Sequence, residues 1–149
     1  MKLATETQPN KEVWIKPMEF ELPAGLIGFP DVVKYELLVN NEELPFMWIR
    51  SVEHHELGFV VIEPSEILSD YEVELPNDDV EKLGINSHED ALIFNIVTIK
   101  DGESIEEATV NLIGPLVLNR NTLIGKQIIV QNYMSLSARH PILSGSVKG

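Results

Sequence analysis

Apolar and polar residues alternate, or gather into short apolar runs, along most of the chain, and this pattern is typical of β-strands. The clearest run is ALIFNIVTI at 91–99. The Asp101-Gly102 pair that follows predicts a tight turn into a returning strand over 104–113. Shorter strands are predicted at 13–15 (ended by Pro17), 20–22, 35–39, 46–49, 57–62 and 71–75.

The stretch Thr109–Pro141 contains three further apolar runs and no Asp or Glu. Gly114-Pro115 and Asn119-Arg120-Asn121 interrupt it, which predicts a strand, a sharp break, a strand, a turn and another strand. We expect this stretch to complete an all-β fold, a small closed β-barrel of about ten short antiparallel strands with two or three short helical turns. Closing the sheet into a barrel removes its edge strands.

The same pattern predicts the helical turns and the core. Pro64–Leu68 fits one helical turn, and Asn77 can cap a short helix that runs to Lys82 and ends at Gly84. The side chains expected to be largely buried are Trp48, Phe59, Phe94, Ile96, Leu112, Leu116 and Ile129.

The chain length of 149 residues suits one domain, which we place at 11–143 between flexible ends at 1–10 and 144–149. There is no Cys, so a disulfide framework and a thiolate zinc site are excluded. The N-terminus lacks the apolar region of a secretory signal, and no apolar run approaches the length of a membrane span. We therefore expect a soluble, cytoplasmic protein that is monomeric or weakly associating.

The acidic charge is concentrated in one part of the chain. The formal net charge is −13, and residues 53–90 hold twelve acidic side chains against one base, Lys82, a net charge of −11 for this segment. Such a field repels phosphate, so direct nucleic-acid binding is not expected. It would attract a basic partner, although an acidic face that serves only solubility is an alternative.

Candidate catalytic and metal-binding residues are sparse. His54 and His55 are adjacent, and in a strand they would point to opposite faces, so an exposed loop is favoured over a metal site. Arg139-His140-Pro141 is interpreted as a strand-terminating turn in which Arg139 pairs with an acid elsewhere. No nucleophile, metalloprotease or phosphate-loop motif is present, so we predict no enzyme activity, no cofactor and no metal.

Five segments, in this order, resemble the flagellar assembly factor FliW family: GLIGFPDVVKYELL, PFMWIRSVE, LGFVVIEP, NLIGPLVLN and GKQIIVQNYMSLSARHPI. The similarity covers about residues 13–142. The resemblance implies a small β-barrel and a non-enzymatic regulator with two protein partners. One is flagellin, held in the cytoplasm before export. The other is CsrA, a basic RNA-binding dimer that represses translation of flagellin mRNA and is antagonised when it is bound.

The resemblance and the charge together suggest where CsrA binds. We expect an acidic patch in the 53–90 segment to contact it, formed by Glu72, Glu74, Asp78, Asp79 and Glu81. The residues that bind flagellin are not predicted. The alternative function is a β-barrel that binds a small molecule, or a hydrolase that uses a pair of carboxylates.

Overall fold

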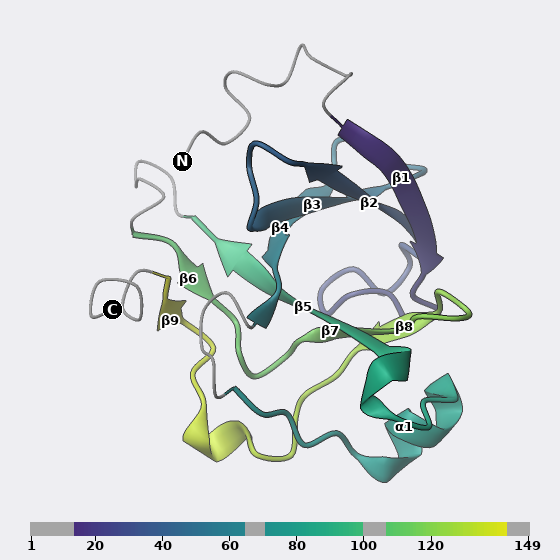
Figure 1. Ribbon diagram of the computed structural model, residues 1–149, viewed down its shortest axis with the longest axis vertical. Coiled ribbons are helices and arrows are strands. Elements are labelled where there is room, and N and C mark those ends of the chain that lie inside the picture. The colour runs from purple at the N-terminus through teal and green to yellow at the C-terminus, as the bar shows by residue number, and fades with distance from the viewer. Residues whose placement is uncertain (1–13, 65–70, 100–106, 143–149) are drawn as a thin grey trace.

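The computed structural model describes residues 14–64, 71–99 and 107–142 of the chain (Figure 1). One α-helix, α1 (Asn77–Leu83), and two 3₁₀ turns, His88–Asp90 and Tyr133–Ser135, lie among the described residues. The strands are β1 (Trp14–Glu21), β2 (Lys34–Asn40), β3 (Phe46–Ser51), β4 (Gly58–Ile62), β5 (Ala91–Thr98), β6 (Thr109–Val110), β7 (Leu116–Asn119), β8 (Gly125–Gln127) and β9 (His140–Pro141).

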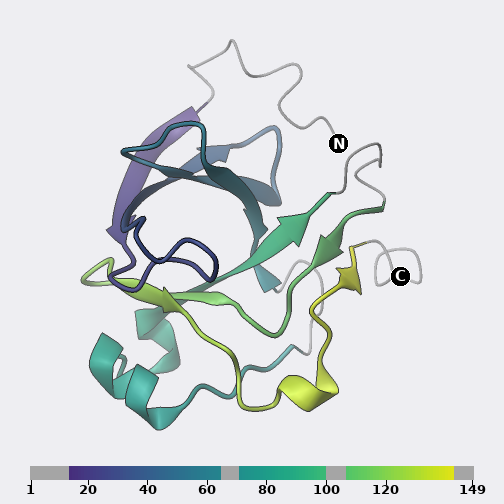
Figure 2. The same cartoon turned by 180° about the vertical axis from the view of Figure 1, so that it is seen from behind.

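All strand pairs in the sheet are antiparallel, and the strands β1 to β5 follow one another in sequence order. The sheet divides at β5. Residues Ala91–Phe94 of β5 pair with β7, which pairs with β8, whereas Val97 and Thr98 pair with β6, which pairs with β9. Figures 1 and 2 show the result, in which β1 to β5, β7 and β8 form a ring and α1 and β9 lie outside it.

The ring closes through a single bridge. Glu21 at the end of β1 lies beside Ile124 in parallel orientation, and the Glu21 N–H donates to the Leu123 carbonyl at 3.0 Å. The predicted all-β antiparallel fold is therefore confirmed. About ten strands in a closed barrel were expected; among the described residues there are nine strands, and no ladder closes the sheet, because the last contact around the ring is one bridge.

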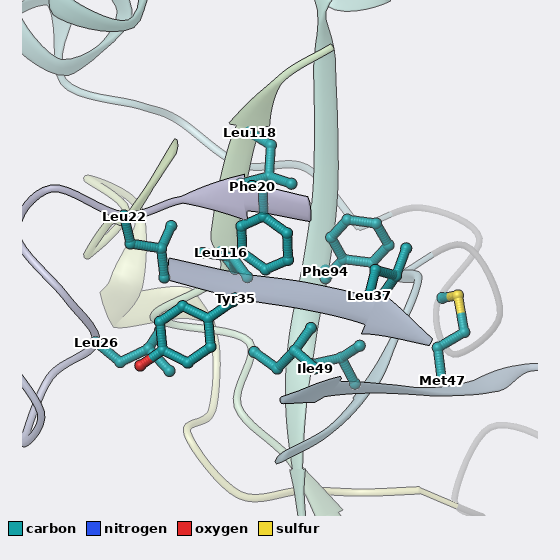
Figure 3. Packing of buried hydrophobic residues seen from close by; sticks show 11 residues of the cluster. Phe20, Leu22, Leu26, Tyr35, Leu37, Met47, Ile49, Phe94, Leu116 and Leu118 are labelled. Atoms are coloured by element: carbon teal, nitrogen blue, oxygen red, sulfur yellow. The ribbon is translucent and has the colours of Figure 1, made fainter. Parts of the chain in front are cut away.

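Eleven buried side chains fill the interior of the ring, and Figure 3 shows them converging from opposite walls. They come from β1, β2, β3, β4, β5, β7 and the loop after β1: Phe20, Leu22, Leu26, Tyr35, Leu37, Met47, Ile49, Val61, Phe94, Leu116 and Leu118. Phe20 and Tyr35 stack with ring centroids 5.8 Å apart. A second, smaller cluster lies around β6 and β9 and consists of Phe46, Ile62, Val97, Ala108, Val110, Leu112 and Ile142.

The predicted core is confirmed at three positions and wrong at one. Phe94, Leu112 and Leu116 are buried, whereas Trp48, Phe59 and Ile96 are only partly buried. Ile129 is 48% exposed, because the chain after β8 alternates and turns Ile128 and Val130 inward instead. Strand geometry sends neighbouring side chains to opposite faces, so one residue of this apolar triplet had to face outward.

Two local predictions about strand ends are also corrected. Pro17 was expected to end the first strand, but β1 continues through it with a register shift between Ile15 and Met18. Proline is tolerated there because the strand has one paired edge and the ladder is irregular at that point. Likewise, His140-Pro141 forms β9 rather than a strand-terminating turn, with His140 opposite Val110.

The predicted hairpin after β5 is confirmed as an antiparallel pair, with Thr98 opposite Thr109. A two-residue turn at Asp101-Gly102 would instead place Thr98 opposite residue 105, so the observed register is shifted by four residues. Asp101-Gly102 themselves lie outside the described residues. So do residues 65–68 of the helical turn predicted at Pro64–Leu68, and the ends expected to be flexible at 1–10 and 144–149.

Candidate functional site

Glu72 and Glu74 lie on an extended stretch, residues 71–76, that runs along the outside of the ring. A strand was predicted here, but the backbone is irregular, because its main partner is a side chain rather than a neighbouring strand. Asn132 Nδ2 donates to the Glu72 carbonyl at 2.9 Å, and the Glu74 N–H donates to Asn132 Oδ1 at 3.0 Å. The predicted alternation is kept, since Glu72 and Glu74 are exposed and Val73 and Leu75 are half-buried.

Tyr71 anchors the start of this stretch. Its hydroxyl donates to the Leu112 carbonyl at 2.6 Å and accepts from Asn95 Nδ2 at 3.3 Å. Asn95 is fully buried and also donates to the Asn111 carbonyl at 2.8 Å. Burial raises the pKa of the Tyr71 hydroxyl above its usual value, and the hydrogen bond from Asn95 lowers it in part. The 71–76 stretch is therefore fixed to β5 and to the segment after β6.

Helix α1 carries the other three predicted acidic side chains. It begins one residue earlier than the capping prediction required, because Pro76 rather than Asn77 takes the N-cap position, and the Pro76 carbonyl accepts from the Asp79 and Val80 N–H groups, each at 3.1 Å. It ends at Gly84 as predicted, with φ at 72°. Asp78 and Glu81 are exposed to solvent.

Asp79 differs from the other predicted acids because it is already paired. Its Oδ1 lies 2.7 Å from Lys126 Nζ, and its side chain is 13% exposed. The pair connects α1 to β8 and neutralises one of the five charges. The acidic groups free to face a partner are therefore Glu72 and Glu74 on the 71–76 stretch and Asp78 and Glu81 on α1.

A groove of about 320 Å³ lies between the 71–76 stretch, α1 and the start of β5. Its lining is mostly apolar: Val73, Leu75, Val80, Ile85, Ala91 and Ile93, with Asn86, Ser87 and His88 at one end. Val73 and Leu75 belong to the stretch that bears Glu72 and Glu74, and Val80 belongs to the helix that bears Asp78 and Glu81. The groove thus lies between the two segments that carry the predicted acids, although none of the five acids lines it, and the sequence did not predict the groove. The alternation at 71–75 was the available signal for its Val73 and Leu75 wall.

Asn119 fixes the far end of α1. Its side chain is buried, and Nδ2 donates to the Leu83 carbonyl at 2.7 Å. Its Oδ1 accepts from the N–H groups of Asn121 and Thr122 at 2.7 and 3.2 Å. One amide therefore holds both the end of the helix and the turn between β7 and β8.

Other candidate chemistry is limited to isolated residues. His54 and His55 are exposed in the loop between β3 and β4, and no cluster of three or more His, Cys, Asp or Glu suited to a metal occurs within 14–64, 71–99 and 107–142. Over those same residues, no helix is both long and apolar enough to cross a bilayer. Arg139 is exposed, and its backbone N–H donates to Ser137 Oγ at 3.0 Å.

Comparison with known proteins gives a consistent result. A family model described as FliW protein matches residues 4–142. The flagellar assembly factor FliW of Clostridioides difficile is 38% identical over 129 residues, which is 86% of this chain and 96% of that protein. That of Natranaerobius thermophilus is 36% identical over 122 residues, 82% of this chain and 80% of that protein.

A solved structure points the same way. The crystal structure of a flagellar assembly factor FliW matches the fold with a TM-score of 0.74 and 31% sequence identity, over 83% of this chain and 84% of that one. The residues that the family model matches include all of the described ones, with the ring, the 71–76 stretch and α1. The chain therefore belongs to the FliW family of flagellar assembly factors.

Proposed function

We propose that this FliW family member is a cytoplasmic, non-enzymatic regulator that binds CsrA and flagellin in turn. Binding to CsrA relieves repression of flagellin mRNA. Free flagellin, when it accumulates before export, takes the protein away from CsrA and restores the repression. Synthesis of flagellin is thereby coupled to its secretion.

The observation that carries this proposal is the exposed acidic surface of the 71–76 stretch and α1. Glu72, Glu74, Asp78 and Glu81 lie in a segment with a net charge of −11, and each is exposed. A basic RNA-binding partner is attracted by such a surface, which speeds encounter and favours the correct orientation. We place the contact beside the RNA-binding surface of CsrA, where the added negative charge also repels RNA.

The alternative of a barrel that binds a small molecule is less well supported. Barrels of that kind hold their ligand in an interior cavity. In the part of this chain that the structure describes, the interior of the ring is filled by the eleven buried side chains of the main core. A carboxylate-dependent hydrolase likewise has no marked pair of acids among the candidates.

Co-purification from the native cells tests the proposal directly. The tagged protein is isolated from cells arrested before flagellin export and from freely exporting cells, and the bound proteins are identified by mass spectrometry. CsrA should dominate when export is active, and flagellin when export is blocked. Recovery of neither protein would contradict the proposal, and a thermal shift with a metabolite would then favour the alternative.

A further inference from the structure

We propose that the turn between β7 and β8, residues 119–124, couples two separate parts of the molecule, so that they open and close together. One part is the segment that follows α1, residues 84–90, which we call the 84–90 loop. The other is the closure of the ring, where the end of β1 meets the turn. Figures 1 and 2 show the turn lying between the end of β1 and α1.

Asn119 gives the turn its shape. Its side chain is buried, and its Oδ1 accepts from the Asn121 and Thr122 N–H groups. Its backbone closes the turn as well, because its carbonyl accepts from the Leu123 N–H at 2.8 Å and its N–H donates to the Ile124 carbonyl at 3.0 Å. A turn in which one residue makes four such bonds moves as a unit.

Three N–H groups of the turn bond to the segment around the 84–90 loop. Asn119 Nδ2 donates to the Leu83 carbonyl at 2.7 Å. The backbone N–H of Arg120 donates to the Asp90 carbonyl at 2.7 Å, and its Nε donates to the Glu89 carbonyl at 2.8 Å. The turn is therefore attached to both ends of the loop, since Leu83 precedes it and Glu89 and Asp90 complete it.

The Asp90 carboxylate joins the loop to the turn through its two oxygens. Its Oδ2 accepts from the Asn86 and Ser87 N–H groups at 3.1 and 3.2 Å, which folds the 84–90 loop around it. Its Oδ1 accepts from Asn121 Nδ2 at 3.3 Å. Hydrogen bonds to a charged acceptor are stronger than those between neutral groups. A shift of the turn therefore disturbs the carboxylate that holds the loop in shape.

The other side of the turn closes the ring. The Glu21 N–H donates to the Leu123 carbonyl at 3.0 Å, and Glu21 and Ile124 form the bridge. Among the described residues, no ladder pairs β1 with β7 or β8. One hydrogen bond contributes little net free energy on its own. The position of the Leu123 carbonyl, which the turn sets, therefore decides whether the ring is closed at this point.

These contacts form a continuous chain of hydrogen bonds from the 84–90 loop through the turn to the end of β1. Because both sides are bonded to the same small unit, opening on one side weakens the other. Coupling of this kind is reciprocal, so a ligand that fixes the loop also favours the closed ring. Residues 85–88 line one end of the groove, and occupation of the groove is therefore one way to close the ring.

Separating the turn from the loop tests the inference. In Arg120→Ala with Asn121→Ala, both side chains are exposed, so the fold should survive, and the turn keeps the bonds made by Asn119. The population of the open state at Glu21 and Ile124 should rise by at least about fivefold, because two of the hydrogen bonds that hold the turn are lost. Nitrogen-15 relaxation dispersion on the free protein measures this population.

The matched control is Asn77→Ala with Arg139→Ala. It removes the same two residue types and the same charge, and both side chains are exposed and lie outside the turn and the 84–90 loop. The control should leave the open population at Glu21 and Ile124 as it is in the wild type. An equal rise in the control, or no rise in the folded Arg120/Asn121 variant, would overturn the coupling.

The reverse experiment starts from the ring. Glu21→Pro removes the N–H that bonds to the Leu123 carbonyl and keeps the pairing of β1 with β2, because this N–H points away from β2. The open population at the Asn86 and Ser87 amides should then rise, although these residues lie on the far side of the turn. Glu19→Pro is the control, since strand alternation directs its N–H to the same edge of β1, two residues before the bridge.

Both experiments use the free protein, so their outcome is independent of the proposed function. A rise at the distant side in each of them supports the coupling. Unchanged Asn86 and Ser87 amides in a folded Glu21→Pro protein would overturn it. So would an equal rise in the middle of β3 and β4, because that result indicates a general loss of stability. If Glu21→Pro does not fold, the Arg120/Asn121 variant decides alone.

Discussion

Lys126 Nζ lies 2.7 Å from Asp79 Oδ1, so the central residue of an acidic helical turn is joined to a strand that follows it by 47 residues in the sequence. The pair has a double effect on the surface around α1. It holds the helix against the ring, and it neutralises one negative charge of α1. Structure and electrostatics at this site are therefore coupled through one contact.

Removing this contact should separate the two effects. Lys126→Gln leaves Asp79 charged and unpaired, so CsrA should associate faster at low salt, and the difference should vanish at high salt. Because the lysine is 43% exposed, the free energy of unfolding should fall by only about 0.2–1 kcal/mol. Lys82→Gln is the control, since it makes the same charge change on the exposed side of α1. It should speed association similarly without loosening the helix, and a slower rate in both variants would contradict the electrostatic model.

Reversing the exposed charges should have the opposite effect. In Glu72→Lys with Glu74→Lys, association with CsrA at low salt should slow markedly and depend less on salt, because both side chains are exposed to water on the acidic 71–76 stretch. Each exposed charge contributes only about 0.2–1 kcal/mol, so a single reversal should be weak. Stopped-flow or surface-based kinetics at two salt concentrations measure this.

The control for that experiment is Glu53→Lys with Glu56→Lys in the loop between β3 and β4. These acids are equally exposed, and the antiparallel pairing of β4 with β5 places their loop at the Thr98 end of β5, away from α1. Equal slowing in both double variants would assign the effect to net charge. Unchanged association in the folded Glu72/Glu74 variant would leave the acidic surface as a solubility feature.

Flagellin binding should survive the same double reversal. We expect its contact to be a helical terminal segment held by apolar side chains, for which Glu72 and Glu74 are not needed. Affinity for flagellin should therefore change by less than about threefold, which corresponds to a free energy within the scatter of surface substitutions. Calorimetric titration with monomeric flagellin measures this affinity. If the double variant lost binding to both CsrA and flagellin, one shared site would be indicated instead.

Truncation in the ring should be far more costly than truncation outside it. Phe94 is 4% exposed within the main core, so Phe94→Ala should lower the free energy of unfolding by about 3–5 kcal/mol. Ile129→Ala is the comparison, because Ile129 is apolar but 48% exposed and should change it by about 0.5 kcal/mol. Chemical denaturation gives both values. A melting temperature of Phe94→Ala equal to that of the wild type would contradict the core assignment.

Tyr71 predicts a dependence of stability on alkaline pH. Burial raises the pKa of its hydroxyl in the folded protein, so the folded state keeps the proton to a higher pH than the unfolded chain does. The contribution of the Tyr71 hydroxyl to stability is complete below the pKa of tyrosine in the unfolded chain, about 10. It is lost as the pH rises through the higher pKa of Tyr71 in the folded protein. Tyr71→Phe should be less stable at neutral pH, because the bond to the Leu112 carbonyl is gone, and should lose less stability on going above pH 10. Parallel pH profiles for the two proteins would show that Tyr71 does not titrate in this way.

The sequence was most informative where a local rule decides the structure. A short apolar run rich in Ile placed β5, and Gly84 ended α1, because strand composition and a left-handed C′ residue act within a few positions. It was least informative for Ile128-Ile129-Val130, where a continuous apolar run does not reveal which residue faces outward.

The candidate site shows the same limit. The exposure of Glu72 and Glu74 follows from a period of two, but the pairing of Asp79 with Lys126 depends on a fold that brings distant segments together. The irregular backbone at 71–76 likewise depends on Asn132, whose amide replaces a neighbouring strand. The groove arises from the combination of all three segments, and no one of them predicts it.

The single bridge that completes the ring has a consequence for hydrogen exchange. Amides inside long ladders exchange only when several bonds break together, whereas the Glu21 N–H is held by one bond to Leu123. Opening between Glu21 and the turn at Leu123 and Ile124 breaks this bond, while the ladders from β1 to β5 and the pairing of β7 with β8 stay intact. The Glu21 amide should therefore exchange through a local opening, well before the amides in the middle of β3 and β4. The ring should open locally at the contact between Glu21 and Leu123.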